Sequence, residues 1–501
     1  MTNKKYIFII YFLFVKVTVS QESILSNKYS LPKNILILST EKYRNKLFYN
    51  DIGSFNKKKN KNWNIELNFT SILNNGHSNV DNNAEFYSTG PNSNFFSTRL
   101  NYSNSWLYIE LEPFIINRIG SFSSDLPIDS YYYLNNHSKS SNYNDTGFKH
   151  SQAIIHYKGI GIGYGIINNW WSSGSHSAIA ISSNSPGQKT YSIGTFKPLE
   201  FGKISLFSKF IVKPYKNEKG EDIYLSGIKS FLSFNSKPII TIGFHRTYLS
   251  GNLKNYFQKI NYNGDWSLID ASKLVFEPLF GKSKSDLDYT YKNVPGADKW
   301  DQILTGYINL VFQDEMFEIN LELSSDDSRS NFTDLRAHWD HSLGYIIGIK
   351  KYHLISKHNI LMFNIEYLST KLSNTFNPSF WRGGGYETNY YYKEEFDYFT
   401  FNGRRIGAHS GSSSDDLIFI FGIGTDKTNT YFSYNKERHG IKSMKYAELK
   451  TEYVFTYHYR LSSRQTAFIT LEYEKIKNFG FIQNNYSVSK LVWLGYSFKI
   501  N

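Results

Sequence analysis

Apolar and polar residues alternate along most of this chain, and this alternation limits its possible folds more than any other feature. In the segment 317–324 (FEINLELS) every odd position is apolar and every even position is polar. A period of two is that of a β-strand with one apolar and one polar face. The same pattern recurs in other segments, among them 107–112, 240–245, 361–367, 452–460 and 469–474. About 17 candidate strands can be counted, many near the ~10 residues that a tilted membrane strand needs.

The polar faces of these strands carry carboxylates, and this favours a membrane barrel over a soluble sandwich. An ionised Glu in a dry core costs several kcal/mol unless it is paired, whereas in a wet barrel lumen it costs little. Aromatic residues gather at strand ends, as at Tyr457, Tyr459 and 390–392, which is typical of girdles at a membrane interface. We therefore predict an all-β fold, a transmembrane outer-membrane β-barrel of antiparallel strands.

Composition removes several other classes of protein. The 501-residue chain has no Cys, which excludes a disulfide scaffold, a thiolate metal site and a cysteine nucleophile. Aromatic residues make up 18% of it, too many for a disordered chain. The mean hydropathy of -0.44 argues against a bundle of membrane helices. The formal net charge of +13 favours acidic partners, including anionic polysaccharide and outer-membrane lipid. Nucleic acid is not expected, because no basic stripe or RNA-binding signature appears.

The N-terminal residues have the layout of an export signal. A basic start (MTNKK, 1–5) precedes the apolar run 6–15, and short residues follow up to Ser20. We predict a signal peptide over 1–20, whose removal lowers the net charge to +10. The segment 21–62 is expected to form a periplasmic cap or plug, and 63–501 the barrel. Long segments without strand character are candidate external loops; they are 74–96, 125–147, 251–298 and 371–415.

A glycine-rich stretch, 158–165 (KGIGIGYG), needs its own interpretation. It lacks the third Gly of a dinucleotide-binding fingerprint. Its glycines instead fall on one face of a strand and Ile160, Ile162 and Tyr164 on the other. We expect this bare face to let an inserted loop or plug pack tightly against the inner wall.

Two segments resemble the capsule-assembly Wzi family, in which an Asn/Arg-Trp-Trp-Gly-Pro-Gly stretch precedes an apolar run and Ser-Asn-Asn-Ala. The segment 169–187 (NWWSSGSHSAIAISSNSPG) keeps Trp170, Trp171 and Gly174, with a Ser-Ser pair in place of Gly-Pro. The segment 405–415 (RIGAHSGSSSD) is similar to the family's Pro-Leu-Gly-x-x-x-Gly-x-x-x-Asp loop, with Arg in place of Pro. Three shorter pieces follow the family's order: 298–303 (DKWDQI), 340–341 and 380–384 (FWRGG).

The resemblance implies an outer-membrane barrel of about 18 strands, plugged by periplasmic helices and external loops. It further implies a lectin that anchors or assembles capsular polysaccharide or exopolysaccharide at the cell surface. It implies neither an enzyme nor a cofactor.

The residues of one long segment suit a sugar site independently. Sugars present apolar faces ringed by hydroxyl groups, so exposed aromatic rings beside planar polar groups are expected. In the segment 380–392 (FWRGGGYETNYYY), Arg382 could hold a uronic-acid carboxylate in a bidentate pair. The candidate polysaccharide-binding residues are Trp381, Arg382, Tyr386, Glu387, Asn389 and Tyr390, together with Trp170 and Trp171. The alternative is that these aromatic rings anchor a loop, or belong to a girdle or a loop core.

Other functions have weaker support. In a porin or polysaccharide-conducting channel, lumen-facing carboxylates would select cations; these are Glu110, Glu112, Glu318, Glu322, Glu472 and Glu474. Ser173, Ser175 and His176 are adjacent, but no Gly-x-Ser-x-Gly elbow supports a hydrolase. His409 and His439 have no partner at ligand spacing, so no metal site is predicted.

Overall fold

The computed structural model describes residues 63–76, 81–82, 92–119, 143–217, 220–251, 300–326, 343–356, 358–371, 390–391, 396–441 and 444–500. Apart from one 3-10 helix (η8, Phe479–Phe481), the named elements of these residues are strands. Their bounds are β1 Asn64–Asn74, β2 Asn92–Ser103, β3 Leu107–Leu111, β4 Pro113–Ile119, β5 Tyr143–Phe148, β6 Ser151–Tyr157, β7 Ile160–Ile167, β8 Gln188–Thr195, β9 Leu199–Phe201, β10 Ile204–Lys216, β11 Asp222–Phe234, β12 Ile239–Gly251, β13 Trp300–Phe312, β14 Phe317–Asp326, β15 Leu343–Leu354, β16 Ile360–Ser369, β17 Thr400–Phe401, β18 Arg404–Arg405, β19 Asp415–Gly424, β20 Thr428–His439, β21 Glu448–Arg460, β22 Gln465–Lys477 and β23 Tyr486–Ile500.

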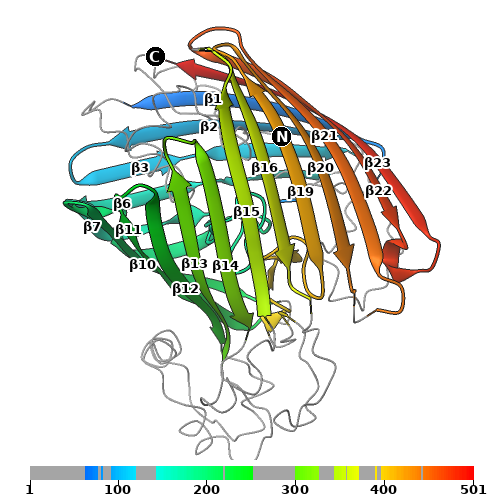
Figure 1. Ribbon diagram of the computed structural model, residues 1–501, viewed down its shortest axis with the longest axis horizontal. Helices are drawn as coiled ribbons and strands as arrows, with labels where there is room; N and C mark the ends of the chain where they lie inside the picture. Colours follow the sequence, from blue (N-terminus) through cyan, green and yellow to red (C-terminus); the bar gives the residue numbers. More distant parts are fainter. Residues whose placement is uncertain are drawn as a thin grey trace, which may run out of the picture.

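All strands except β17 and β18 form one antiparallel sheet that closes on itself (Figure 1). The closing pair is β1 with β23, in register from Ile65 opposite Ile500 to Asn74 opposite Leu491. Three strands of the wall are interrupted, at Glu112, at 149–150 and at 196–198, so that β3 and β4, β5 and β6, and β8 and β9 each form one strand. The result is the all-β fold predicted from the alternation, a closed antiparallel barrel of 18 strands. Closure pairs the first strand with the last, so neither is an edge of the sheet.

The two ends of the barrel differ in their connections. At one end short turns join the strands, such as 313–316 between β13 and β14 and 425–427 between β19 and β20. At the other end the connections are longer, up to the segments between β12 and β13 and between β16 and β19. Outer-membrane barrels have short turns on the periplasmic side and longer loops outside. We call these the short-turn end and the long-loop end.

The barrel is inverted relative to a soluble protein, with polar residues inside and apolar residues outside. On β14, Glu318 and Glu322 are at most 2% exposed and face the interior, whereas Leu321 and Leu323 are 37% and 48% exposed. The alternation predicted for 317–324 is therefore confirmed. Large apolar side chains stay exposed on the outer face all around the wall, as expected of a surface that contacts lipid. No helix in the described ranges is long and apolar enough to cross a membrane.

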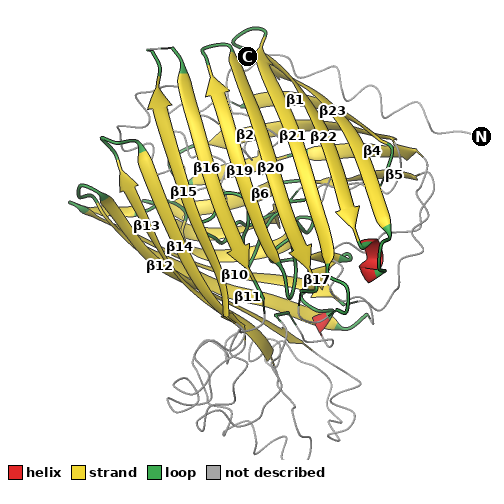
Figure 2. Cartoon of the chain, turned by 45° about the vertical axis from the view of Figure 1, so that its right-hand side comes forward, coloured by secondary structure: helices red, strands yellow, loops and turns green. Residues whose placement is uncertain are grey.

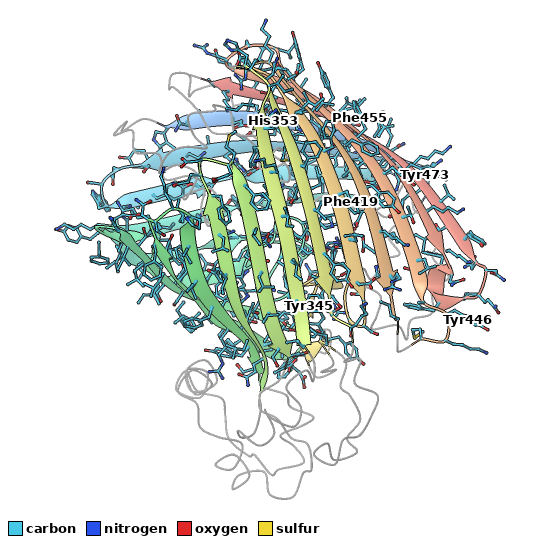
Figure 3. All side chains as sticks on the ribbon, in the orientation of Figure 1. Tyr345, His353, Phe419, Tyr446, Phe455 and Tyr473 are labelled. Atoms are coloured by element: carbon cyan, nitrogen blue, oxygen red, sulfur yellow. The ribbon has the colours of Figure 1, made fainter. Side chains whose placement is uncertain are left out.

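A row of aromatic rings crosses four neighbouring strands on the outer face. Phe419, Tyr434, Tyr453 and Tyr473 stand opposite one another in register. Successive ring centroids lie 6.3, 5.2 and 6.5 Å apart, and Figure 3 shows Phe419 and Tyr473 on the sheet. Two residues nearer the long-loop end, β20 and β22 expose Lys436 and Lys475. This order of apolar, aromatic and basic residues is typical of the passage from hydrocarbon to headgroups.

The glycines of 158–165 pack against a neighbouring strand. Gly161 and Gly165 lie on the inner side of β7, and a Cβ at either position would come within 2.1 or 2.3 Å of a carbonyl oxygen of the strand β6. A Cβ at Gly163 would meet Ser192, Ile154 and Phe196. The bare face thus permits close packing, as predicted, but the partners are strand β6 and Phe196 in place of an inserted loop.

The inverted barrel leads to a prediction about its outer face. Ile347, near the middle of β15, is 45% exposed, and Ile355, in the turn after β15, is 56% exposed. Ile347→Arg should lower the free energy of unfolding by ~2–4 kcal/mol, because it places a charge in hydrocarbon, whereas Ile355→Arg should cost only ~0–1 kcal/mol. Denaturant unfolding from lipid vesicles measures both, and equal costs would contradict a lipid-facing wall.

Candidate functional site

Two segments between wall strands fold into the barrel, and they carry the two segments that resemble the Wzi family, except for Asp415, which begins β19. Inner loop 1 (168–187) connects β7 to β8, and inner loop 2 (396–414) carries β17 and β18 and leads into β19. A β-bridge joins Trp171 to Ile181 within inner loop 1. The two loops meet where Ser182 N donates to Ile406 O at 2.7 Å. Figure 2 shows β17 at the end of the barrel that carries the longer connections.

An apolar core packs both loops against the wall near the long-loop end. From the loops and the adjoining pair Tyr390–Tyr391 it takes Trp171, Ile179, Ala180, Ile181, Tyr390, Tyr391, Phe396, Phe399, Ile406 and Ala408. From the wall it takes Ile211, Ile223, Leu225, Leu249, Ile303, Ile346 and Leu368. Burying one large apolar side chain stabilises by about 1.5–3 kcal/mol. The loops therefore belong to a core of the folded protein, because their apolar side chains pack against the inner wall.

Two wall carboxylates hold the backbone of inner loop 1. Glu366 on β16 accepts from the backbone N–H groups of Ser175 and Ser177 at 2.6 and 2.7 Å, from that of His176 at 3.1 Å, and from the Ser175 hydroxyl at 3.0 Å. Glu322 on β14 accepts from Ser172 Oγ and Ser173 N, each at 2.9 Å. Hydrogen bonds to a carboxylate are about twice as strong as neutral ones. The serines that replace the family's Gly-Pro pair are among the donors.

Two buried arginines join the loops to each other. Arg404 Nε donates to Asn184 O and its Nη2 to Asn184 Oδ1, each at 2.7 Å. Asn184 Nδ2 donates in return to Arg405 O at 3.1 Å. The Arg405 guanidinium lies over the Tyr391 ring at 4.9 Å. Arg405, at the family's Pro position, thus has a structural role in the core.

A polar cluster lies beside the apolar core. Asp416 on β19 contacts Ser177 Oγ at 2.9 Å, His176 Nε2 at 3.2 Å and His409 Nε2 at 3.1 Å. Burial disfavours the charged form of His409, but Asp81, Asp416 and Glu437 outweigh this effect and raise its pKa. The prediction that His409 has no ligand-type partner relied on sequence spacing; the fold brings His176 and His409 together from distant segments.

Most of the predicted sugar-binding residues lie outside the described residues: Trp381, Arg382, Tyr386, Glu387 and Asn389. The three that are described do not form an open platform. Tyr390 and Trp171 are 1% and 0% exposed, in the core. Trp170 is half-buried, and its Nε1 donates to Gly174 O at 2.9 Å. Stacking on a sugar needs an exposed ring face, so the structure places Tyr390 and Trp171 in the alternative role, that of a loop core. Because Tyr390 lies in the interior core, it is also not part of an aromatic girdle at the membrane interface.

The fold and this interior define a class: a closed 18-stranded β-barrel of the outer-membrane type, with loops packed inside it. Its structure is similar to that of Wzi, an outer-membrane protein involved in group 1 capsule assembly in Escherichia coli and described as a carbohydrate-binding β-barrel. The TM-score is 0.56 at 10% sequence identity, over 86% of this chain and 83% of that one. At this identity the similarity shows the fold alone.

Channels of the outer membrane are similar to a lower degree. OccAB2 of Acinetobacter baumannii gives a TM-score of 0.44 at 8% identity, over 89% of this chain and all (100%) of that one. The channel DcaP of the same organism gives 0.35 at 9% identity, over 87% and 96%. No family model matches the sequence, and no curated protein matches it.

The anchoring carboxylates lead to a prediction about inner loop 1. Because the chain has no Cys, Ser173→Cys places a single thiol on this loop. Adding Glu366→Gln removes the charge from an acceptor of three backbone N–H groups, and thiol labelling should become at least about tenfold faster. Glu318→Gln is the matched control, because Glu318 bonds Asn309 at 2.8 Å on the wall. Equal labelling in both variants would show that Glu366 does not hold the loop.

Proposed function

We propose that this protein binds a surface polysaccharide at the outer membrane and retains it at the cell surface, without turning it over. The observation that carries the proposal is the packing of both inner loops inside the barrel, fastened to the wall by Glu322 and Glu366. Loops packed inside the barrel in this way suit a binding protein better than an open channel. The similarity of its fold to the carbohydrate-binding barrel of Wzi supports this choice.

In this proposal the long-loop end faces outward and carries the sugar site. The aromatic row from Phe419 to Tyr473, with Lys436 and Lys475 beyond it, supports this orientation. Polysaccharide contact is assigned to Trp381 and Arg382 with their neighbours, and not to the buried Tyr390 and Trp171. We also assign 1–20 to an export signal and 21–62 to a periplasmic cap.

The proposal predicts where the polymer is found in cells. In a strain that lacks this protein, synthesis should continue while the polysaccharide moves from the cell fraction to the medium. Complementation with Trp381→Ala plus Arg382→Ala should restore the barrel but leave most of the polymer in the medium. Sugar assay of both fractions measures retention, and heat-modifiable migration in gels measures folding.

The matched control is Trp106→Ala plus Arg464→Ala. It removes the same two residue types from exposed turns at the short-turn end, where Trp106 is 54% exposed. This variant should retain polysaccharide as the unmodified protein does. Normal retention by the Trp381/Arg382 variant would remove that segment from the site. Unchanged retention in the deletion strain would overturn the function itself.

The second candidate function is a porin or polysaccharide-conducting channel. Glu110, Glu318 and Glu322 point inward, and each is at most 3% exposed. This orientation favours a negative electrostatic potential in the lumen, which attracts cations. Conduction requires, however, that inner loops 1 and 2 leave the core in which they are packed.

A further inference from the structure

Three ligand-type side chains meet where the inner loops touch the wall. His176 comes from inner loop 1, His409 from inner loop 2 and Asp416 from β19. They are 3%, 0% and 1% exposed. One nitrogen or oxygen from each lies within 4.8 Å of the other two. His176 is far from His409 and Asp416 in the sequence, so only the packing of inner loop 1 against inner loop 2 and β19 completes the cluster.

The spacing of their atoms is that of ligands around one ion. His176 Nε2 and His409 Nε2 lie 3.2 and 3.1 Å from the same oxygen, Asp416 Oδ2. Ligands of a tetrahedral zinc ion lie about 3.3 Å apart, because each is about 2.0 Å from the metal. Two imidazoles with a carboxylate form a donor set that suits zinc and related divalent ions.

Several atoms of the cluster have no hydrogen-bond partner among the described residues. They are His176 Nδ1, His409 Nε2 and Asp416 Oδ1. Buried polar atoms normally have a partner. His409 Nε2 lies 3.1 Å from Asp416 Oδ2, a separation that also suits two ligands of a common ion.

The side chains around the cluster also carry an excess of negative charge, which a bound cation would balance. Lys450 Nζ contacts Asp81 and Glu437 at 2.6 and 2.8 Å. Lys450 Nζ also lies 3.5 and 3.7 Å from Glu452 and Glu474, so four carboxylates surround one ammonium group. Glu437 also contacts His439 Nε2 at 3.0 Å, and Asp416 lies beside His176 and His409. An uncompensated buried charge is strongly destabilising. A divalent cation removes this imbalance.

We propose that His176, His409 and Asp416 bind one zinc-class divalent cation that fastens both inner loops to the barrel wall. Glu437 flanks the site: its Oε1 lies 3.9 Å from His409 Nε2, and it forms a second triad with Asp81 and His409. Asn82 is the outer contact of His409, with Nδ2 3.4 Å from Nδ1. Asn82 Nδ2 also donates to His176 O at 2.9 Å, so Asn82 contacts both histidine residues.

The test uses the full chain, purified in detergent with a tag that contains no histidine and stripped with a chelator. After equilibration with Zn²⁺ and removal of the excess, elemental analysis should find about one zinc per folded chain. His409→Ala and Asp416→Asn should each lose most of it. His245→Ala is the matched control, because His245 is equally buried (0% exposed) on β12, and it should retain the zinc.

A second measurement covers the case in which the variants do not fold. Co²⁺ added to the stripped, unmodified protein should give the intense visible absorption of a tetrahedral site, and Zn²⁺ should displace it. A folded chain that binds no zinc and gives no such spectrum overturns the proposal, and protonated histidines then balance the carboxylates. Zinc retained by folded His409→Ala also overturns it. Polysaccharide retention is a separate readout, so either proposal can fail alone.

Discussion

The interior of this barrel is governed by the need to satisfy carboxylates that a membrane wall points inward. Period-two strands that present Leu and Ile to lipid place Glu322 and Glu366 in the lumen, where they are almost fully buried. A buried carboxylate without partners is costly. Inner loop 1 supplies those partners from its backbone and its serines. The position of the loop follows from the wall, because the donors must reach the acceptors.

The apolar core also holds the inner loops in place, in addition to the hydrogen bonds to Glu322 and Glu366. Once the backbone of inner loop 1 is held against β14 and β16, Trp171 and Ile179 face Tyr391 and the wall residues near the long-loop end. Arg404 and Asn184 join inner loop 2 to this arrangement. Both loops are part of the native core, and moving them requires breaking many contacts at once. The proposed metal site would add one more fastening at the point where both loops meet β19.

The wall could be predicted from the sequence, and the interior could not. Alternation in 317–324 reports directly which residues face lipid, because the strand period is local. Trp171 and Tyr390 were candidates for stacking on a sugar because both are aromatic. The sequence does not reveal whether an aromatic ring is exposed. His176, His409 and Glu366 were missed as partners because their contacts join distant segments. One sequence feature indicated the contact between inner loops 1 and 2. Each carries a segment that resembles the same family, and such segments are expected to lie close in the fold, as these two do.

If inner loops 1 and 2 close the barrel, the purified protein should insert into a planar lipid bilayer and pass almost no current at moderate voltage. Insertion is confirmed independently by protease protection of the barrel. Ion conductance is the quantity measured, and large, steady single-channel currents from the unmodified protein would show that the loops leave the barrel open as a channel.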